Sequence, residues 1–298
     1  MKLKGPWLVL LCYLLFGIFP LYWKLLSNLN PYFILTNRVI WSLGFAVMIL
    51  IVQNQFAHLG EMLHDAKMRR VLALSGFLLV VNWGTYIIAI NTNHVIDASL
   101  AYYLNPIISI ILGQFFFKEK LTGLQKLSVV IATAGVLYAV ISFHTVPWLA
   151  LIMGGSFSFY GALKKTVKNI DGVTSLAIEN IMMLLPAMLG FVYLLTHGQT
   201  ASGSPVLWWQ WLLLPTTGII TGLPLVIYAK GIRDTSYSLS GILMYINPTM
   251  QLLCGIFIFN EPFTHVYAVL FGFVWCAVFL YLCSTLGQLW WQTHKKEG

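Results

Sequence analysis

Tyr103-Leu104-Asn105-Pro106 opens a stretch that ends at Thr122 and recurs 142 residues later, from Tyr245 to Thr264. Eight of its 20 positions are identical without a gap: Tyr103/Tyr245, Asn105/Asn247, Pro106/Pro248, Gly113/Gly255, Phe115/Phe257, Phe117/Phe259, Glu119/Glu261 and Thr122/Thr264. A single long period of this kind indicates an internal duplication. The sequence therefore predicts one unit used twice, with a first repeat at 1–142 and a second repeat with a short tail at 143–298.

The composition places the chain in a lipid bilayer. Of its 298 residues, 59% are hydrophobic and 9% are charged, and the mean hydropathy is +0.81. Soluble proteins carry roughly 25% charged residues. The net charge of +8 comes from dispersed basic residues beside apolar runs, so we do not expect a nucleic-acid partner. The four cysteines lie in apolar runs without a CxxC motif and predict free thiols, with no metal site and no cofactor.

The apolar runs predict an all-α integral membrane protein, because a spanning helix needs roughly 20 apolar residues. Ten transmembrane helices are expected, five in each repeat: 6–26, 33–52, 70–91, 97–116, 122–142, 147–166, 174–196, 209–230, 237–258 and 264–287. An odd number of helices per repeat turns the second copy upside down relative to the first. Inverted repeats of this kind occur in many secondary transporters, with the substrate site near the midplane between them.

The basic residues predict the orientation of these spans. Fifteen of the 17 fall on one side: Lys2, Lys4, Lys67, Arg69, Arg70, Lys118, Lys120, Lys126, Lys164, Lys165, Lys168, Lys230, Arg233, Lys295 and Lys296. Cytoplasmic loops carry an excess of Lys and Arg. Both termini are therefore expected in the cytoplasm.

The duplicated Asn-Pro pairs lie about half-way along their predicted helices. Each proline removes a backbone donor and frees the carbonyl four residues earlier, at Tyr102 or Met244. Irregular backbone at this depth is tolerated where it faces protein or a water-filled cavity. Asn105 and Asn247 are therefore candidate substrate-binding residues on a shared pocket wall. The alternative is a helix kink in which the asparagine holds two helices together.

Two ionisable residues lie inside predicted spans, at near-equivalent places in the repeat. Arg38 is in 33–52 and Glu179 is in 174–196, and 38 plus 142 is 180. Ionisable groups within the bilayer are functional candidates by default. We therefore predict a coupling or charge role for both. The alternative is that each side chain extends to the nearer membrane interface.

Aromatic residues away from the predicted interfaces are further candidates for the pocket: Trp83, Tyr86, Tyr103, Tyr160 and Tyr245. The alternative for each is plain packing between helices. Glu119 is expected to serve the turn after its helix, and Thr122-x-x-Gln125 fits a capping box there.

With the duplication in view, the chain resembles the drug/metabolite transporter superfamily, whose members contain two five-helix EamA units. Within it, the RarD subfamily is similar at several stretches: Thr36-Asn37-Arg38-Val39-Ile40-Trp41-Ser42, Asn82-Trp83, Ala98-Ser99-Leu100-x-Tyr102, Asn105-Pro106 through Leu112-Gly113 to Glu119, Phe157-Ser158-Phe159-Tyr160-Gly161, and Tyr245-x-x-Pro248-Thr249 to Glu261. Asn247 departs from the subfamily, which often has glycine there. The resemblance implies a plasma-membrane permease for a small organic metabolite or a chloramphenicol-type drug, working by efflux or by exchange against a proton or counter-solute.

The sequence as a whole predicts a secondary transporter that is not an enzyme. HExxH, GxSxG, GxGxxG and GxxxxGK[ST] are absent from the sequence. The expected partners are a small-molecule substrate and the lipid bilayer. Two alternatives stay open: a membrane-embedded lipid-modifying enzyme, which needs clustered polar residues at one interface, and a non-transporting membrane scaffold, which needs no paired breaks at mid-depth.

Overall fold

The computed structural model describes residues 4–91, 95–143, 148–167, 170–202, 205–260 and 263–294. The first half contains α1 (Lys4–Gly17), α2 (Phe19–Leu25), α3 (Pro31–Gln53), α4 (Phe56–His64), α5 (Ala66–Asn91), α6 (Val95–Phe117) and α7 (Gly123–Phe143). The second contains α8 (Trp148–Thr166), α9 (Gly172–Thr196), α10 (Trp208–Leu213), α11 (Thr216–Gly231), the 3₁₀ helix η1 (Ile232–Asp234), α12 (Tyr237–Leu243), α13 (Ile246–Phe257) and α14 (His265–His294).

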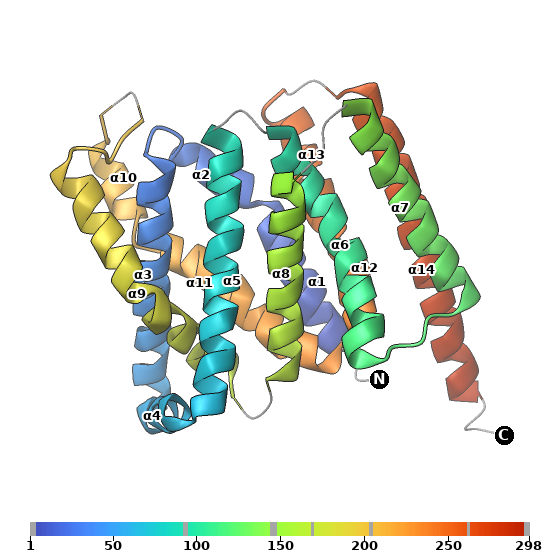
Figure 1. Ribbon diagram of the computed structural model, residues 1–298, viewed down its shortest axis with the longest axis horizontal. Coiled ribbons are helices and arrows are strands. Elements are labelled where there is room, and N and C mark those ends of the chain that lie inside the picture. The colour runs from blue at the N-terminus through green and yellow to red at the C-terminus, as the bar shows by residue number, and fades with distance from the viewer. Residues whose placement is uncertain are drawn as a thin grey trace.

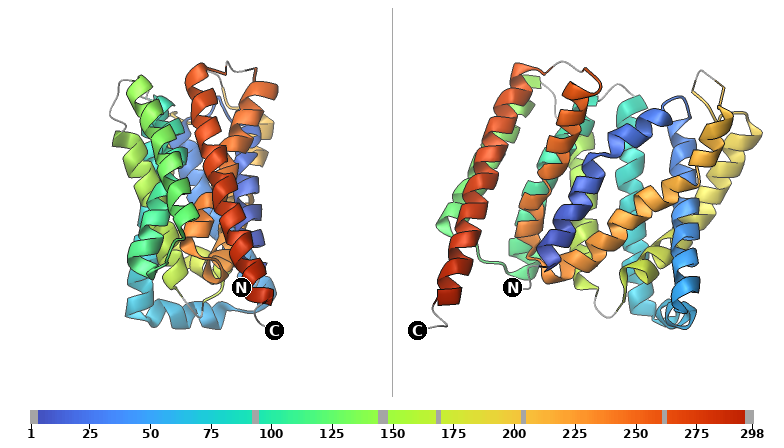
Figure 2. Two further views of the ribbon diagram at one scale, coloured as in Figure 1. Left: turned by 90° about the vertical axis from the view of Figure 1, so that its right-hand side faces the viewer. Right: turned by 180° about the vertical axis from the view of Figure 1, so that it is seen from behind.

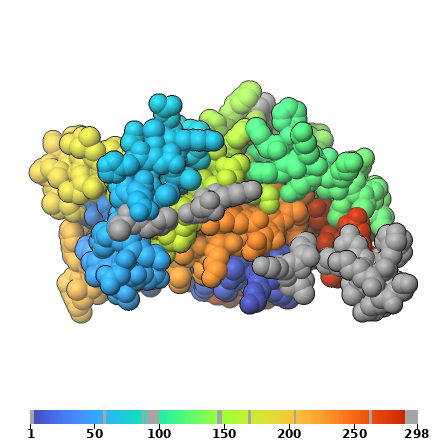
Figure 3. Space-filling model, turned by 90° about the horizontal axis from the view of Figure 1, so that it is seen from below, coloured from blue at the N-terminus to red at the C-terminus, as the bar shows by residue number. Residues whose placement is uncertain are grey.

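The long helices run between two ends of the molecule, and both chain termini lie at the same end (Figure 1). We call this end the terminal face and the other end the opposite face. The short helix α4 lies across the terminal face, which Figure 2 shows from the side. Seen from below in Figure 3, the orange segment around α11 and α12 lies in the middle of the terminal face.

Eight segments of the described chain are long and apolar enough to cross a membrane: Lys4–Leu25, Pro31–Gln53, Leu100–Phe117, Gly123–Phe143, Gly172–Thr196, Trp208–Asp234, Tyr237–Phe257 and His265–Gln288. The protein is therefore an all-helical, multi-pass membrane protein. The predicted spans 70–91 and 147–166 correspond to α5 and α8, which are not among the eight. Both helices carry basic residues at the terminal face and pack against each other along their length.

The helices pack in pairs that relate the two halves. α3 packs on α9 and α7 packs on α14, while α5 packs on α8 as α1 packs on α11. Within each of these pairs the two helices run in opposite directions (Figure 1). Gly76 and Gly218 lie 142 residues apart, and a Cβ on either would meet the backbone of a helix in the other half, at Glu179 and Trp41 respectively. Small residues permit such close backbone approach between membrane helices.

The two Asn-Pro helices differ in continuity. α6 is a single helix of 23 residues through Pro106, whereas the second copy is divided at Met244–Tyr245 into α12 and α13. The Met244 carbonyl was predicted to be free, and that prediction is wrong. At the break the backbone forms a tighter turn, in which the Asn247 N–H donates to the Met244 carbonyl, three residues earlier, at 2.9 Å. A further break at Ile18, before Pro20, separates α1 from α2.

The turn from α6 to α7 confirms the predicted capping box. The Thr122 backbone N–H donates to Gln125 Oε1 at 2.9 Å, and the Gln125 N–H donates to Thr122 Oγ1 at 3.2 Å. Glu119 was expected to bond within the turn after α6, but it bonds to a helix that is distant in the sequence. Its carboxylate accepts from the backbone N–H groups of Tyr237 and Ser238 at 2.6 and 2.8 Å, and so caps the start of α12. Its repeat partner Glu261 lies outside the described residues.

Candidate functional site

A cavity of about 310 Å³ lies between the two halves of the chain, in the part of the molecule nearer the opposite face. Residues from α1, α2, α3, α5, α6, α8 and the α12–α13 segment form its wall. The lining is largely aromatic and aliphatic, with a few amides and two basic residues: Phe16, Phe19, Pro20, Trp23, Lys24, Arg38, Asn82, Trp83, Tyr86, Ala101, Tyr102, Asn105, Met153, Phe157, Met244, Asn247 and Gln251. Small-molecule sites have this character, apolar walls with a few placed polar groups.

Both asparagines of the duplicated motif line this cavity, and both are buried. The Asn105 side chain is held from α8, because Ser158 Oγ donates to its Oδ1 at 2.7 Å. The Asn247 Oδ1 accepts from Gln251 Nε2, one turn later in α13, at 2.8 Å. In both residues the side-chain carbonyl oxygen therefore accepts a hydrogen bond, and no described residue accepts one from either amide nitrogen.

Arg38 enters the cavity from α3 and lies between two indole rings. Its guanidinium carbon is 4.0 Å from the ring centroid of Trp83 and 4.8 Å from that of Trp23. Its Nε donates to Thr221 Oγ1 on α11 at 3.2 Å. These contacts fix the plane of the guanidinium group, and cation–π contact of this kind contributes roughly 0.5–2 kcal/mol.

The wall becomes more buried toward the centre of the molecule. Lys24 and Tyr86 are exposed, and Tyr86 keeps 40% of its surface accessible. At the inner end, Met244 and Asn247 are each 3% exposed. Because α2 and the end of α5 lie at the opposite face (Figure 1), the cavity opens toward that face.

A layer of buried aromatic rings closes the cavity toward the terminal face. Phe157 ends the cavity wall and contacts Tyr160, with ring centroids 5.6 Å apart. Tyr160 stacks on Tyr228 at 6.4 Å, and Tyr228 contacts Tyr13 at 5.9 Å. The Tyr13 hydroxyl shares a hydrogen bond with Ser240 Oγ at 3.0 Å. We call Tyr13, Phe157, Tyr160 and Tyr228 the aromatic layer.

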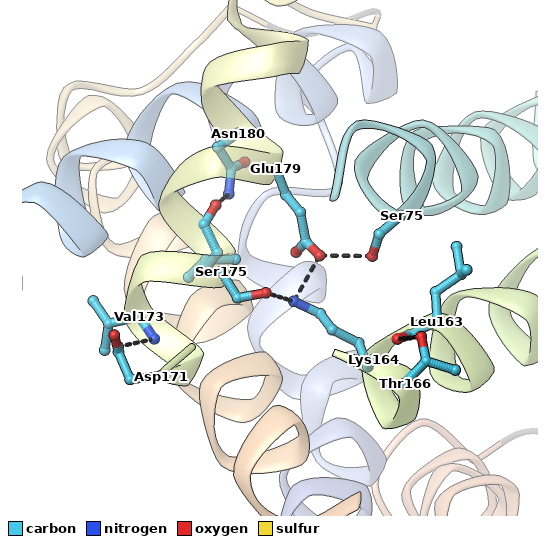
Figure 4. Close-up of polar contacts among 10 residues, drawn as sticks. Ser75, Leu163, Lys164, Thr166, Asp171, Val173, Ser175, Glu179 and Asn180 are labelled. Atoms are coloured by element: carbon cyan, nitrogen blue, oxygen red, sulfur yellow. Dashed lines mark hydrogen bonds and ion pairs between the residues drawn. The ribbon is translucent and has the colours of Figure 1, made fainter. Parts of the chain in front are cut away.

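A buried ion pair lies on the terminal-face side of the aromatic layer. Figure 4 shows this pair. Lys164 Nζ on α8 lies 2.6 Å from Glu179 Oε1 on α9, and the two side chains are 2% and 1% exposed. Ser75 Oγ on α5 donates to the same carboxylate oxygen at 2.6 Å, and Lys164 Nζ donates to Ser175 Oγ at 2.6 Å. Within the described chain, the second carboxylate oxygen, Oε2, has no hydrogen-bond partner. Lys164 Nζ also lies 5.4 Å from the Tyr160 ring centroid, which joins the pair to the aromatic layer.

The structure brings together five of the nine predicted site residues. Arg38, Trp83, Tyr86, Asn105 and Asn247 line the cavity. Four others lie elsewhere: Tyr103, Tyr160, Tyr245 and Glu179. The Tyr245 hydroxyl donates to the Tyr103 carbonyl at 3.3 Å, and the Tyr103 ring packs on Phe271 at 5.6 Å, so these two residues join α6, α13 and α14 behind the wall.

The first half of the chain carries a family signature. The model of the EamA-like transporter family matches residues 3–141. The uncharacterized transporter YojE of Bacillus subtilis is 36% identical over 300 residues, covering 99% of this chain and 97% of that protein. The chain belongs to the EamA-like transporter family.

Other relatives of this EamA-like protein carry the RarD name. Protein RarD of Escherichia coli is 31% identical over 95% of either chain, and the chloramphenicol-sensitive protein RarD of Pseudomonas aeruginosa is 26% identical over 93% of either chain. A protein crystal structure superposes with a TM-score of 0.70 at 14% identity, covering 93% of this chain and 96% of that one. At that identity the superposition shows a shared fold only.

Several residues of the EamA-like protein's site carried no clear signal in its sequence. Asn82 precedes Trp83, and Gln251 follows Asn247 by one helical turn. Both could have been predicted as neighbours of site residues. Trp23 and Lys164 could not, because one lies near a span end and the other was counted among the basic residues of the terminal face. Within the described residues, no cluster of His, Cys, Asp and Glu could hold a metal ion.

Proposed function

We propose that this protein is a secondary transporter that binds a small organic solute in the central cavity and exposes it alternately to the two membrane faces. One observation carries the proposal. Asn105 and Asn247 occupy the same position in two copies of one sequence unit, and both line one cavity. Equivalent midplane positions meet in this way when two inverted repeats share an axis in the membrane plane.

The packing supports two inverted five-helix halves, 1–142 and 143–298. The equivalent helices α3 and α9 pack on each other in opposite directions, as do α7 and α14. The family model ends at residue 141, close to the proposed boundary. In this arrangement α5 and α8 also cross the membrane, which makes ten spans. Both helices line the cavity with one face and expose large apolar side chains on another, such as Phe77 on α5 and Ile152 on α8.

The charge distribution supports a plasma-membrane protein with cytoplasmic termini. Described basic residues outside the cavity fall at helix ends on the terminal face, as in Lys67 at the start of α5 and Lys230 at the end of α11. The positive-inside rule assigns that face to the cytoplasm. The cavity would then open outward, and transport would be efflux or exchange against a proton or counter-solute. The name of the Pseudomonas relative makes a chloramphenicol-type drug one candidate solute.

Ligand-dependent thermal stability of the purified full-length protein tests this proposal. A library of metabolites and drugs, chloramphenicol included, is screened, and each stabilising compound is then assayed for counterflow in proteoliposomes. We expect at least one compound to stabilise the protein and to be transported, and we expect Asn105→Ala and Asn247→Ala to weaken both effects. Lys126→Ala, at an exposed position on α7, is the control. Stabilising compounds that are never transported would favour a scaffold or a receptor instead.

Cysteine labelling tests the orientation separately. On a cysteine-free background, Gln199→Cys and Ser202→Cys should react with an impermeant reagent in intact cells. His294→Cys, at the end of α14, should react only after permeabilisation. Labelling of His294→Cys in intact cells would show that the assigned orientation or the number of spans is wrong.

A further inference from the structure

The charge of the cavity is one-sided. Of the described residues that line it, Lys24 and Arg38 are the only two with full charges, and both are basic. Neither Asp nor Glu occurs in that lining. Lys24 is exposed and lies near the mouth, with its Nζ 5.5 Å from the Phe259 ring centroid. Arg38 lies deeper, between the two indoles.

The described contacts of Arg38 are with neutral groups. It contacts the hydroxyl of Thr221 and the rings of Trp23 and Trp83, and among the side chains that the structure describes no carboxylate lies within ion-pair distance of it. The contrast with Lys164 is direct, since Lys164 has Glu179 at 2.6 Å. Because Nε is used by Thr221, the two Nη groups remain as a planar pair of donors. Arginine binds carboxylates in two parallel hydrogen bonds through such a fork.

A cation held within the membrane depth is energetically unfavourable, and such residues are functional candidates by default. A bound anionic group would supply the counter-charge. The neighbouring polar groups also favour an anionic solute. The Oδ1 atoms of Asn105 and Asn247 accept bonds from Ser158 and Gln251, so their amide nitrogens add two more donors to the wall. Trp83 and Phe157 supply flat apolar surface beside these donors.

We infer that the solute is a small organic anion with an apolar or aromatic body. Its carboxylate binds the Nη groups of Arg38, its body lies against Trp83 and Phe157, and Lys24 attracts it at the mouth. The cavity volume of about 310 Å³ suits a small solute, since it lies at the lower end of the range of ligand pockets, roughly 300 to 1,000 Å³. This inference rests on the proposed transport function and narrows its substrate class.

Matched probes that differ only in charge test the inference. Phenylacetate, phenylacetamide and phenethylamine share one ring and one short linker, and carry a negative, a neutral and a positive group. Related triplets with indole and aliphatic bodies complete the panel. Binding to the purified full-length protein is followed by thermal shift and by tryptophan fluorescence, because Trp23 and Trp83 flank Arg38. We expect carboxylates to bind roughly tenfold or more tightly than their amides, and the amines to bind most weakly.

Variants then assign the preference to Arg38. Arg38→Gln should reduce the carboxylate-to-amide ratio to about one, whereas Arg38→Lys, which keeps the charge without the fork, should retain part of it. Lys126→Gln removes a charge outside the cavity and should keep the full ratio. If Arg38→Gln does not fold, the wild-type ratio and Arg38→Lys still decide the question.

Three binding results would overturn the inference. Amides or amines could bind as well as the carboxylates, or no carboxylate in the panel could bind. The preference for carboxylates could also survive in Arg38→Gln. Transport of a neutral or cationic solute that is weakened by Asn105→Ala would also overturn it. That last result would leave the proposed transport function standing, so the two proposals can fail separately.

Discussion

The two charged sites occupy corresponding places in the two halves of the chain, but they differ in partner and in access. Arg38 projects from α3 toward α2 and α11, and Glu179 projects from α9 toward α8 and α5. These are the equivalent helices of the two repeats. Among the described side chains Arg38 has no acidic partner, and it faces an open cavity, whereas Glu179 is paired with Lys164 and sealed.

The same contrast holds for the repeat-equivalent tyrosines. Tyr86 is 40% exposed at the cavity, while Tyr228, 142 residues later, is 2% exposed within the aromatic layer. At these two positions, therefore, the residue of the first half meets the cavity and its counterpart in the second half is packed. Equivalent positions in the sequence carry polar groups in both halves, and the packing around each one decides whether it faces the cavity or another side chain.

The largest expected effect comes from breaking the sealed pair. Lys164→Met leaves the Glu179 carboxylate buried without its partner, and removal of one member of a buried pair destabilises by roughly 3–5 kcal/mol. We expect a large fall in the melting temperature of the purified protein. Arg38→Met is the matched variant of the open site, and it should cost less because no buried acid is left behind. Equal destabilisation of both variants would remove the distinction between the sites.

A smaller effect is expected at the two cavity asparagines. Loss of a hydrogen bond to a bound solute costs about 1–3 kcal/mol, so affinity should fall roughly 5- to 150-fold in Asn105→Ala and Asn247→Ala. Binding of any transported solute, measured by thermal shift, checks this. Asn105→Ala should also lower stability, because it removes the acceptor for Ser158. Unchanged affinity in both variants would mean that the asparagines only hold helices together.

Some of this arrangement was accessible from the sequence. Apolar runs located helices such as α3 and α9 to within two residues, because proline or an Asx cap begins them and the end of the apolar run closes them. Helix α4 and the break at Ile18 were missed, since neither follows from average hydropathy. Irregular backbone was expected at both Asn-Pro pairs, but α6 continues through Pro106, and only the second copy is divided, at Met244–Tyr245. Each depends on how the neighbouring helices pack.

Some residues of the site were also predictable from the sequence, and others were not. The duplication placed Asn105 and Asn247 at equivalent depth, and symmetry then indicated that they lie near each other. The pairing of Lys164 with Glu179 had no sequence signal, because the two residues belong to different helices and Lys164 looked like one more surface charge. Tyr160 and Tyr245 were reasonable pocket candidates by depth, but helix rotation, which depth does not specify, turns them away from the cavity.

A neutral version of the sealed pair tests whether its charge couples to transport. Glu179→Gln alone leaves Lys164 without a counter-charge, so the double variant Lys164→Met with Glu179→Gln is the better probe. Paired removal of buried charges is often close to neutral for stability. Opening of the terminal face would hydrate Glu179 and allow it to exchange a proton there. We therefore expect a folded protein whose transport rate varies less between mildly acidic and mildly alkaline medium than that of the wild type. A pH profile identical to that of the wild type would assign the pair a structural role only.

The smallest effect is expected at the aromatic layer between the two sites. The Tyr160 hydroxyl is buried and has no hydrogen-bond partner among the residues that the structure describes. Tyr160→Phe removes this group and keeps the ring contacts with Phe157 and Tyr228, so the free energy of unfolding should change by no more than about 1 kcal/mol. Because the ring lies beneath the cavity wall, solute affinity should also stay unchanged, whereas Tyr86→Phe removes a hydroxyl from an exposed residue of the cavity wall and should weaken binding. Thermal unfolding and ligand binding of the two variants separate these positions. A loss of affinity in Tyr160→Phe that matches or exceeds the loss in Tyr86→Phe would show that the solute reaches the aromatic layer, and the boundary between the open and sealed halves would then lie nearer the Lys164–Glu179 pair.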